Sequence, residues 1–181
     1  GGTQRLPRLI GVPDALDLIV NGLRVTAERA LTLGLIDNIV DGDLLSAAID
    51  YARRCADGTQ PLRRTSTLNE RLAATPADPS LFNDFRQKIT RNARGYDAPY
   101  ACVDCIEASV TQPFTEGLAN ERATFLRLVS SDQSKALRHA FFAEREVNKI
   151  PDVPKYTPTR SIERSAVVGC GTMGRGIAMT F

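Results

Sequence analysis

The chain has 181 residues, of which 43% are apolar and 24% charged, and its formal net charge is +2. These values are ordinary for a soluble globular protein of one or two domains, and they exclude a strongly basic protein that binds nucleic acid or membrane surfaces. No apolar run approaches the length of a membrane span, and no signal peptide is recognisable. Because the first residue is Gly1 rather than Met, we expect the chain to begin inside a longer protein.

Apolar residues recur at helical spacing through most of the chain, which predicts a mainly helical structure. Thr26, Ser80, Thr115 and Ser134 are expected to cap helix starts, because their hydroxyls accept a backbone hydrogen bond. Gly34 is expected to end a helix in the left-handed conformation. The expected helices cover residues 13–20, 27–33, 44–55, 81–94, 99–110, 116–128 and 135–148.

Four stretches are expected to lack helix. Residues 1–11 predict a glycine-opened turn followed by a short apolar segment, and residues 35–40 predict an extended, partly buried segment. Residues 57–79 have little apolar periodicity and several Gly and Pro residues, which predicts an irregular connection. Residues 150–161 contain three prolines and predict a semi-rigid linker.

The C-terminal stretch carries the clearest functional signal. Residues 166–168 are typical of a buried parallel strand, and residues 176–181 of the start of a helix. Between them, Gly169, Gly171 and Gly174 form the spacing G-x-G-x-x-G. In dinucleotide sites the first glycine permits a tight turn, the second lets the backbone approach a pyrophosphate, and the third allows close packing. The acidic residue that binds the ribose, about 20 residues further on, would lie beyond Phe181.

Three other groups of residues are weaker candidates for chemistry. Cys102 and Cys105 form a C-x-x-C pair inside a predicted helix, and no second pair offers zinc-ligand spacing, so we interpret them as small residues of a reduced protein. The lone histidine, His139, has no companion for metal binding or catalysis. A basic group on the predicted helix 81–94 is interpreted as a solvated face, with phosphate binding as the alternative. This group consists of Arg86, Lys88, Arg91 and Arg94.

Two separate passages resemble one family of enzymes. Gly1-Gly-Thr-Gln-Arg-Leu-Pro-Arg-Leu-Ile-Gly11, with Gly34-Leu-Ile-Asp37, closely resembles the second half of the enoyl-CoA hydratase (crotonase) fold. Val167-Val-Gly-Cys-Gly-Thr-Met-Gly-Arg-Gly-Ile-Ala178 closely resembles the start of the nucleotide domain of 3-hydroxyacyl-CoA dehydrogenases. Residues 136–145 resemble the helix that links the two halves in peroxisomal-type bifunctional enzymes and their bacterial relatives. Together these passages resemble the bifunctional β-oxidation family over essentially the whole chain.

The resemblance implies an α/β parent, of which this chain would be a mainly α internal part. Residues 1–57 would form the C-terminal part of a crotonase-like domain, and residues 58–149 a helical extension. Residues 150–164 would be the Pro-rich linker, and residues 165–181 the truncated start of a Rossmann NAD-binding domain.

In the resembling family, the first half hydrates trans-2-enoyl-CoA to 3-hydroxyacyl-CoA, often with isomerase activity, and the second half oxidises the product with NAD. The resemblance implies an acyl-CoA substrate, a thiolase or a further copy as partner, and a bacterial cytoplasmic or alternatively peroxisomal location. The catalytic groups would lie upstream of Gly1 and downstream of Phe181, so no catalytic residue is assigned and no turnover is expected from this piece alone. The residues expected to contact NAD are Gly169, Gly171, Thr172, Met173 and Gly174.

Two other interpretations of the sequence stay open. The first is a monofunctional NAD-dependent dehydrogenase that carries a helical leader. The second is a non-catalytic helical adaptor in which the glycine turn occurs by chance. The segment over residues 1–37 argues against the first, and saturable dinucleotide binding would exclude the second.

Overall fold

The computed structural model describes residues 1–74, 79–147, 149–154 and 156–181. These residues divide into two compact units, Gly1–Leu137 and Arg138–Phe181. The described residues contain helices and irregular segments and no strand, which agrees with the expectation of a mainly α chain. The first unit contains α1 (Gly2–Ile10), α2 (Val12–Asn21), α3 (Ala27–Leu33), α4 (Leu44–Ala56), η1 (Thr65–Thr67), α5 (Glu70–Ala73), α6 (Pro79–Ala93), α7 (Asp97–Thr111) and α8 (Phe114–Ser130). Helix α9 (Asp132–Val147) crosses the boundary between the units, and α10 (Thr172–Ala178) lies in the second.

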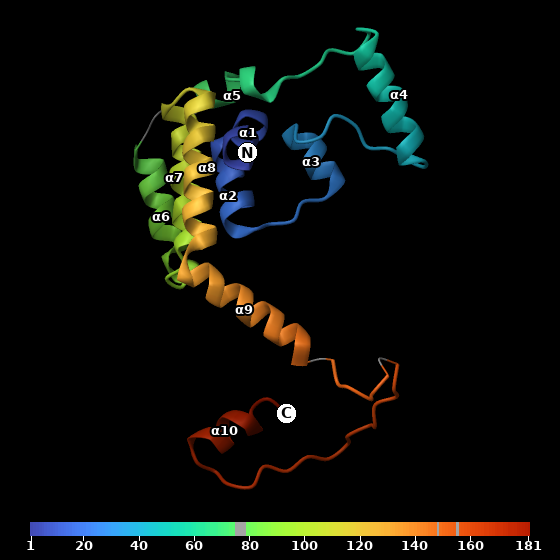
Figure 1. The fold of residues 1–181 in the computed structure, drawn as a ribbon, viewed down its shortest axis with the longest axis vertical. Helices are drawn as coiled ribbons and strands as arrows, with labels where there is room; N and C mark the ends of the chain where they lie inside the picture. The colour runs from blue at the N-terminus through green and yellow to red at the C-terminus, as the bar shows by residue number, and fades with distance from the viewer. Residues whose placement is uncertain (75–78, 148, 155) are drawn as a thin grey trace. The chain divides into compact units, whose positions relative to one another are not determined.

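Helix α7 is the centre of the first unit. It packs against α1, α2, α6 and α8, and Figure 1 shows α6, α7 and α8 running side by side. Val103 and Ile106 of α7 are completely buried, and burial of such a side chain contributes about 1.5–3 kcal/mol. The main core consists of Val12, Leu16, Leu72, Phe82, Phe85, Ile89, Val103 and Ile106. Helices α2, α5, α6 and α7 therefore share one core.

The N-terminal segment is a helix, so the expected turn and apolar segment over residues 1–11 are wrong. Pro7 lies inside α1 and supplies no backbone N–H, which disfavours a helix locally. Ile10 nevertheless packs with Ala15 of α2 and Leu33 of α3, and Leu6 and Leu9 cover this second core. Short helices owe most of their stability to such packing, which explains why local sequence preferences misled here.

The limits of α3 are confirmed. The Arg29 N–H donates to the Thr26 hydroxyl at 3.3 Å, and Gly34 has φ 79° and ψ 18°. The expected helices at 13–20, 44–55, 81–94, 99–110, 116–128 and 135–148 correspond to α2, α4 and α6 to α9 with shifted ends. Asn148, the last residue of the expected helix 135–148, lies outside the described residues.

Three predicted helix caps are wrong. Ser80, Thr115 and Ser134 all lie inside helices, because α6, α8 and α9 begin two or three residues before the expected starts. At α9 the hydroxyl that accepts the early N–H belongs to Ser131, which lies 3.1 Å from the Ser134 nitrogen. Each helix thus begins at an earlier residue that can also start a helix.

The strand expected at residues 166–168 is absent from the described structure. Val168 is fully exposed. A strand exists only where its N–H and C=O groups meet those of a neighbour, and the described residues offer none. Residues 35–37 form bends and residues 38–40 are irregular, with Leu35 and Ile36 half-buried and Ile39 and Val40 exposed. The expected strand therefore fails for want of a partner.

The expected irregular connection over residues 57–79 is only partly irregular. It contains η1 and α5, and both pack against α1. The part of this expectation that covers residues 75–78 lies outside the described residues. Over residues 150–161 the described part has turns and no helix, and Lys155 is outside it. Among the described helices, none is long and apolar enough to cross a membrane.

Candidate functional site

The three glycines of the G-x-G-x-x-G spacing lie in a turn that leads directly into α10. Gly169 has φ 104°, a left-handed value that residues with a side chain rarely adopt. Gly171 is extended and immediately precedes α10, and a Cβ there would meet no atom within 4 Å. The backbone at Gly171 is therefore open to close approach by a ligand.

Gly174 lies in α10 against the start of the turn. A Cβ at this position would overlap the Gly169 carbonyl oxygen, would lie 2.9 Å from the Gly169 carbonyl carbon, and would lie 3.7 Å from Val167 Cγ1. The first turn of α10 is closed by the Arg175 N–H, which donates to the Gly171 carbonyl at 3.0 Å. The three glycines therefore have three different steric roles: Gly169 takes a left-handed φ, Gly171 leaves the backbone open, and Gly174 packs closely on Gly169.

The structure brings all five predicted cofactor-contacting residues into this one turn. Thr172 and Met173 form the first turn of α10 and are exposed. The turn offers backbone N–H groups, the Thr172 hydroxyl and the exposed Cys170 thiol, and it contains no carboxylate or histidine.

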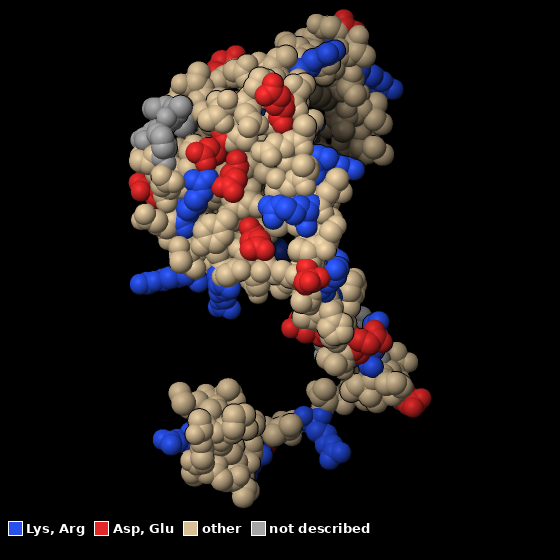
Figure 2. All heavy atoms as spheres, turned by 60° about the vertical axis from the view of Figure 1, so that its left-hand side comes forward, with Lys and Arg blue, Asp and Glu red and all other residues tan. Residues whose placement is uncertain are grey.

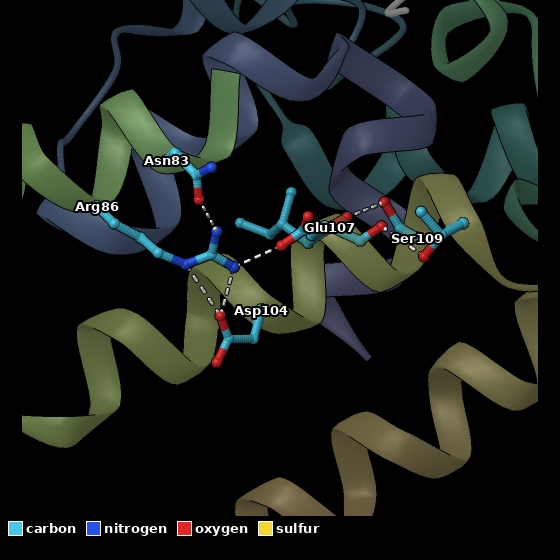
Figure 3. A network of polar contacts seen from close by, with 7 residues as sticks. Asn83, Arg86, Asp104, Glu107 and Ser109 are labelled. Atoms are coloured by element: carbon cyan, nitrogen blue, oxygen red, sulfur yellow. Dashed lines mark hydrogen bonds and ion pairs between the residues drawn. The ribbon is translucent and has the colours of Figure 1, made fainter. Parts of the chain in front are cut away.

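The basic group on α6 is not simply a solvated face. Arg86 donates to Asp104 Oδ1 from Nη2 at 2.6 Å and from Nε at 3.2 Å, and to Glu107 Oε2 at 2.5 Å (Figure 3). Its Nη1 donates to Asn83 Oδ1 at 3.3 Å. Burial lowers the pKa of Arg86, but the hydrogen bonds to Glu107 and Asp104 outweigh this effect and hold the pKa above its usual value. Arg86 therefore joins α6 to α7, and its donors are already occupied.

The other members of the basic group are exposed. Lys88 Nζ lies 3.6 Å from Asp17 Oδ1 on α2, and Arg91 faces solvent. Arg94 lies beyond the end of α6 and has φ 48°. In Figure 2, acidic side chains (red) and basic side chains (blue) are interspersed over the upper part of the face in view. The solvated-face prediction fits these residues, and the phosphate-binding alternative gains no support from Arg86.

The C-x-x-C pair lies one turn apart on α7, beside a cavity of about 880 Å³. The cavity is lined on its other side by Leu118, Phe125 and Leu128 of α8. Both thiols are free, and burial raises the pKa of Cys102 and of Cys105. His139 is exposed on α9, and the described residues contain no cluster of three or more groups that could hold a metal.

A buried polar cluster was not predicted from the sequence. Gln4 is completely buried, and its Nε2 donates to the Cys105 carbonyl at 2.7 Å, across 101 residues of sequence. Arg8, one turn further along α1, donates to the Gln4 carbonyl at 2.5 Å. The guanidinium of Arg8 lies 5.0 Å from the centre of the Phe114 ring. The one sign of this cluster in the sequence is that Gln4 and Arg8 would lie on the same face of a helix. Residues 1–11 were not expected to be helical, so this sign could not be used.

Comparison with known proteins assigns the chain to a class. Nearly the whole chain is homologous to a segment of the multifunctional enzymes of fatty acid β-oxidation, which confirms the resemblance seen in the sequence. No protein-family model matches the chain.

The relatives come from animals, plants and bacteria. The chain is 42% identical over 184 residues to the peroxisomal bifunctional enzyme of Homo sapiens, covering 99% of this chain and 25% of that protein. It is 35% identical over 180 residues to a peroxisomal fatty acid beta-oxidation multifunctional protein of Arabidopsis thaliana, covering 98% and 25%. It is 36% identical over 183 residues to the fatty acid oxidation complex subunit alpha of Shewanella loihica, again covering 98% and 25%. The chain therefore spans about a quarter of the length of these relatives.

Proposed function

We propose that the chain is part of a bifunctional enzyme of fatty acid β-oxidation. The enzyme hydrates trans-2-enoyl-CoA to 3-hydroxyacyl-CoA and then oxidises the 3-hydroxyl group to a ketone with NAD. The observation that carries this proposal is homology over 98–99% of the chain, which runs through both the N-terminal helices and the glycine turn.

In this proposal the chain spans the junction between the two activities. Residues 1–57 belong to the crotonase-like domain, residues 58–149 to a helical extension, residues 150–164 to the linker, and residues 165–181 to the start of the NAD-binding Rossmann domain. The packing of α1 and α2 on α7 supports a role for the extension as a continuation of the hydratase half. In the complete Rossmann domain, residues 166–168 would gain the strand partners that they lack here.

The glycine turn holds the pyrophosphate of NAD. The residues that form this contact are Gly169, Gly171, Thr172, Met173 and Gly174. The open backbone at Gly171 and the close packing of Gly174 on Gly169 fit such a group. NAD, when bound, accepts the hydride from the carbon that bears the 3-hydroxyl group. The residues of this chain only position the cofactor, so the isolated chain is expected to catalyse neither reaction.

The same homology supports proposals for the substrate, the location and the partners. The substrate is an acyl-CoA thioester, and the enzyme acts in the cytoplasm of a bacterium or, alternatively, in a peroxisome. A bacterial relative is named as the alpha subunit of a fatty acid oxidation complex, which supports a thiolase as partner, with a further copy of the chain as the alternative.

The test of the cofactor site is a titration of the purified full-length protein with NADH, followed by fluorescence. We expect saturable binding that Gly174→Ala weakens at least tenfold, because the new Cβ overlaps the Gly169 carbonyl oxygen. Gly176→Ala is the matched control, since its Cβ would meet no atom within 4 Å. Equal affinity of the two variants would reject the assigned turn, and a lack of any binding would reject the dehydrogenase activity.

A further inference from the structure

Arg8 of α1 is a buried cation without a counter-ion in the described structure. Only 4% of its surface is exposed. Its Nη1 donates to the Gln4 carbonyl at 2.5 Å, its Nη2 makes a long contact of 3.5 Å with the Ser109 carbonyl, and its Nε has no hydrogen-bond partner among the described residues. Burial lowers the pKa of Arg8. The groups that contact this charge are therefore two carbonyl oxygens and the face of the Phe114 ring, and no described carboxylate pairs with it.

A buried charge without an opposite charge is costly, because it has lost the solvation that water supplied. Arg86 provides the internal comparison: it is more exposed than Arg8 and yet pairs with two carboxylates. Carbonyl groups and an aromatic face compensate only part of a full positive charge. An anion that approaches the guanidinium would therefore gain a strong, poorly screened interaction.

A cavity lies beside this guanidinium. Its volume is about 510 Å³, which is within the range of small-molecule sites. Arg8 lines it from α1, and four neutral polar residues line it from η1, from the start of α5 and from the end of α7: Ser66, Asn69, Ser109 and Gln112. No acidic side chain belongs to the described lining, so nothing in the wall repels an anion.

The rest of the wall is apolar. It includes Leu72 of α5, Val110 of α7, and Pro113 and Phe114 at the start of α8. A ligand that fits must therefore combine one compact anionic group with a small apolar part. Short-chain carboxylates and small phosphate monoesters share this chemistry.

We propose that the cavity between α1, α5 and the end of α7 is a binding site for a small organic anion, whose carboxylate or phosphate group pairs with Arg8. Nη1 is held by the Gln4 carbonyl and Nε is sealed from solvent, so the weakly engaged Nη2 is the donor that the anion uses. The site is separate from the proposed dinucleotide turn, since none of its lining residues belongs to residues 165–181. It goes beyond the proposed function and does not depend on it.

The experiment is a calorimetric titration of the purified full-length protein with sodium butyrate and, separately, with inorganic phosphate, at constant ionic strength. We expect saturable binding of at least one probe, and the tighter probe identifies the anionic group. Arg8→Met should weaken this binding at least tenfold. The matched control is Arg5→Met, because Arg5 lies on the same helix and beside the same Phe114 ring but lines the other cavity. Its affinity should equal that of the wild type.

A second variant keeps the test decisive if Arg8→Met does not fold. Gln112→Glu places a carboxylate in the wall of the same cavity and leaves Arg8 intact. It should raise the melting temperature in the absence of the probes and abolish their binding. The proposal is overturned if neither probe binds the wild type. The same result is expected if a carboxylate from another segment of the protein fills the cavity. It is likewise overturned if Arg8→Met or Gln112→Glu binds as tightly as the wild type.

Discussion

Gly117 is where α8 meets the buried amide of α1. A Cβ at this position would overlap Gln4 Oε1 and would lie 2.8 Å from Gln4 Cδ. Gln4 cannot easily move away, because its Nε2 is bonded to the Cys105 carbonyl and its side chain is completely buried. The contact between α1, α7 and α8 therefore requires glycine here.

Gly117→Ala should lower the free energy of unfolding by about 1–3 kcal/mol, the usual cost of overpacking a buried contact. Gly2→Ala is the control, because a Cβ at Gly2 would meet no atom within 4 Å. Urea unfolding of both variants measures the effect. Equal stability of the two variants would show that Gln4 rearranges without cost.

The cysteines differ in their predicted reactivity. Burial raises the pKa of Cys102 and Cys105, so a smaller fraction of each is thiolate at a given pH, whereas Cys170 is exposed in the glycine turn. With iodoacetamide at about pH 8, Cys170 should be alkylated at least several-fold faster than the α7 pair. Mass spectrometry of quenched samples gives the three rates. Faster alkylation of Cys102 or Cys105 would contradict their burial.

At this scale, the sequence predicted features that depend on neighbours along the chain. The Thr26 cap and the Gly34 terminus are confirmed because each acts within a few residues. The roles of Gln4 and Arg8 could not be predicted, because they depend on α7 residues that lie 101 positions away. The glycine spacing predicts close packing at Gly174, and the structure shows that Gly174 is tightly packed and that Gly176 is not.

The contact between α6 and α7 combines apolar packing with one arginine network. Arg86 reaches both Asp104 and Glu107, and its side chain is 26% exposed, against 67% for Lys88. A partly buried arginine with two carboxylates contributes more than an exposed lysine pair.

Arg86→Met should therefore destabilise the first unit by about 1 kcal/mol, and Lys88→Met should have an effect near zero. The difference should shrink in high salt, because the Arg86 network is only partly shielded from water. Chemical unfolding at low and high salt tests this prediction. A larger loss in Lys88→Met than in Arg86→Met would contradict the assigned network.

Helix α4 depends on its N-cap rather than on packing. None of its residues is buried, and Asp43 accepts hydrogen bonds from the Ser46 hydroxyl and the Leu45 N–H. The Ser46 hydrogen bond, followed by that of Leu45, holds the pKa of Asp43 below its usual value.

Because the folded pKa is the lower one, the stabilisation is present above the unfolded pKa of about 4 and is lost as pH falls through the folded value. We expect the protection of α4 amides, measured against the intrinsic exchange rate at each pH, to fall over this acidic range in the wild type and to show a flatter response in Asp43→Asn, which retains a capping oxygen without the titration. Hydrogen exchange at a series of pH values measures both. A parallel response of the two proteins would exclude Asp43 as the cause.

At the scale of elements, the sequence predicted most helices but misplaced several starts. Amphipathic spacing is clear in α2 and α6, because one face of each meets the shared core, whereas α7 is buried on several sides because it packs against α1, α2, α6 and α8. Caps were less predictable, since Ser80, Thr115 and Ser134 compete with earlier residues that also start a helix. Helix α1 was missed because Pro7 and the opening glycines disfavour a helix that tertiary packing nevertheless stabilises.

At the scale of the whole molecule, the chain joins a packed helical unit to a second unit that carries the glycine turn. The mainly helical character of the first unit follows from periodicity. The missing strand at residues 166–168 could not be judged from local sequence, because pairing depends on strands that the described chain does not contain. Both units lie within the segment that is homologous to the multifunctional enzymes of fatty acid β-oxidation.

We propose that these units belong to one enzyme with two successive activities. The most direct measurement supplies purified full-length protein with trans-2-enoyl-CoA and NAD, and follows enoyl consumption and NADH formation in the same sample. We expect enoyl consumption and NADH formation in the wild type and in Gly176→Ala. Gly174→Ala should consume the enoyl substrate but accumulate 3-hydroxyacyl-CoA. NADH formation without hydration of the enoyl substrate, or hydration with no NADH in the wild type, would contradict this proposal.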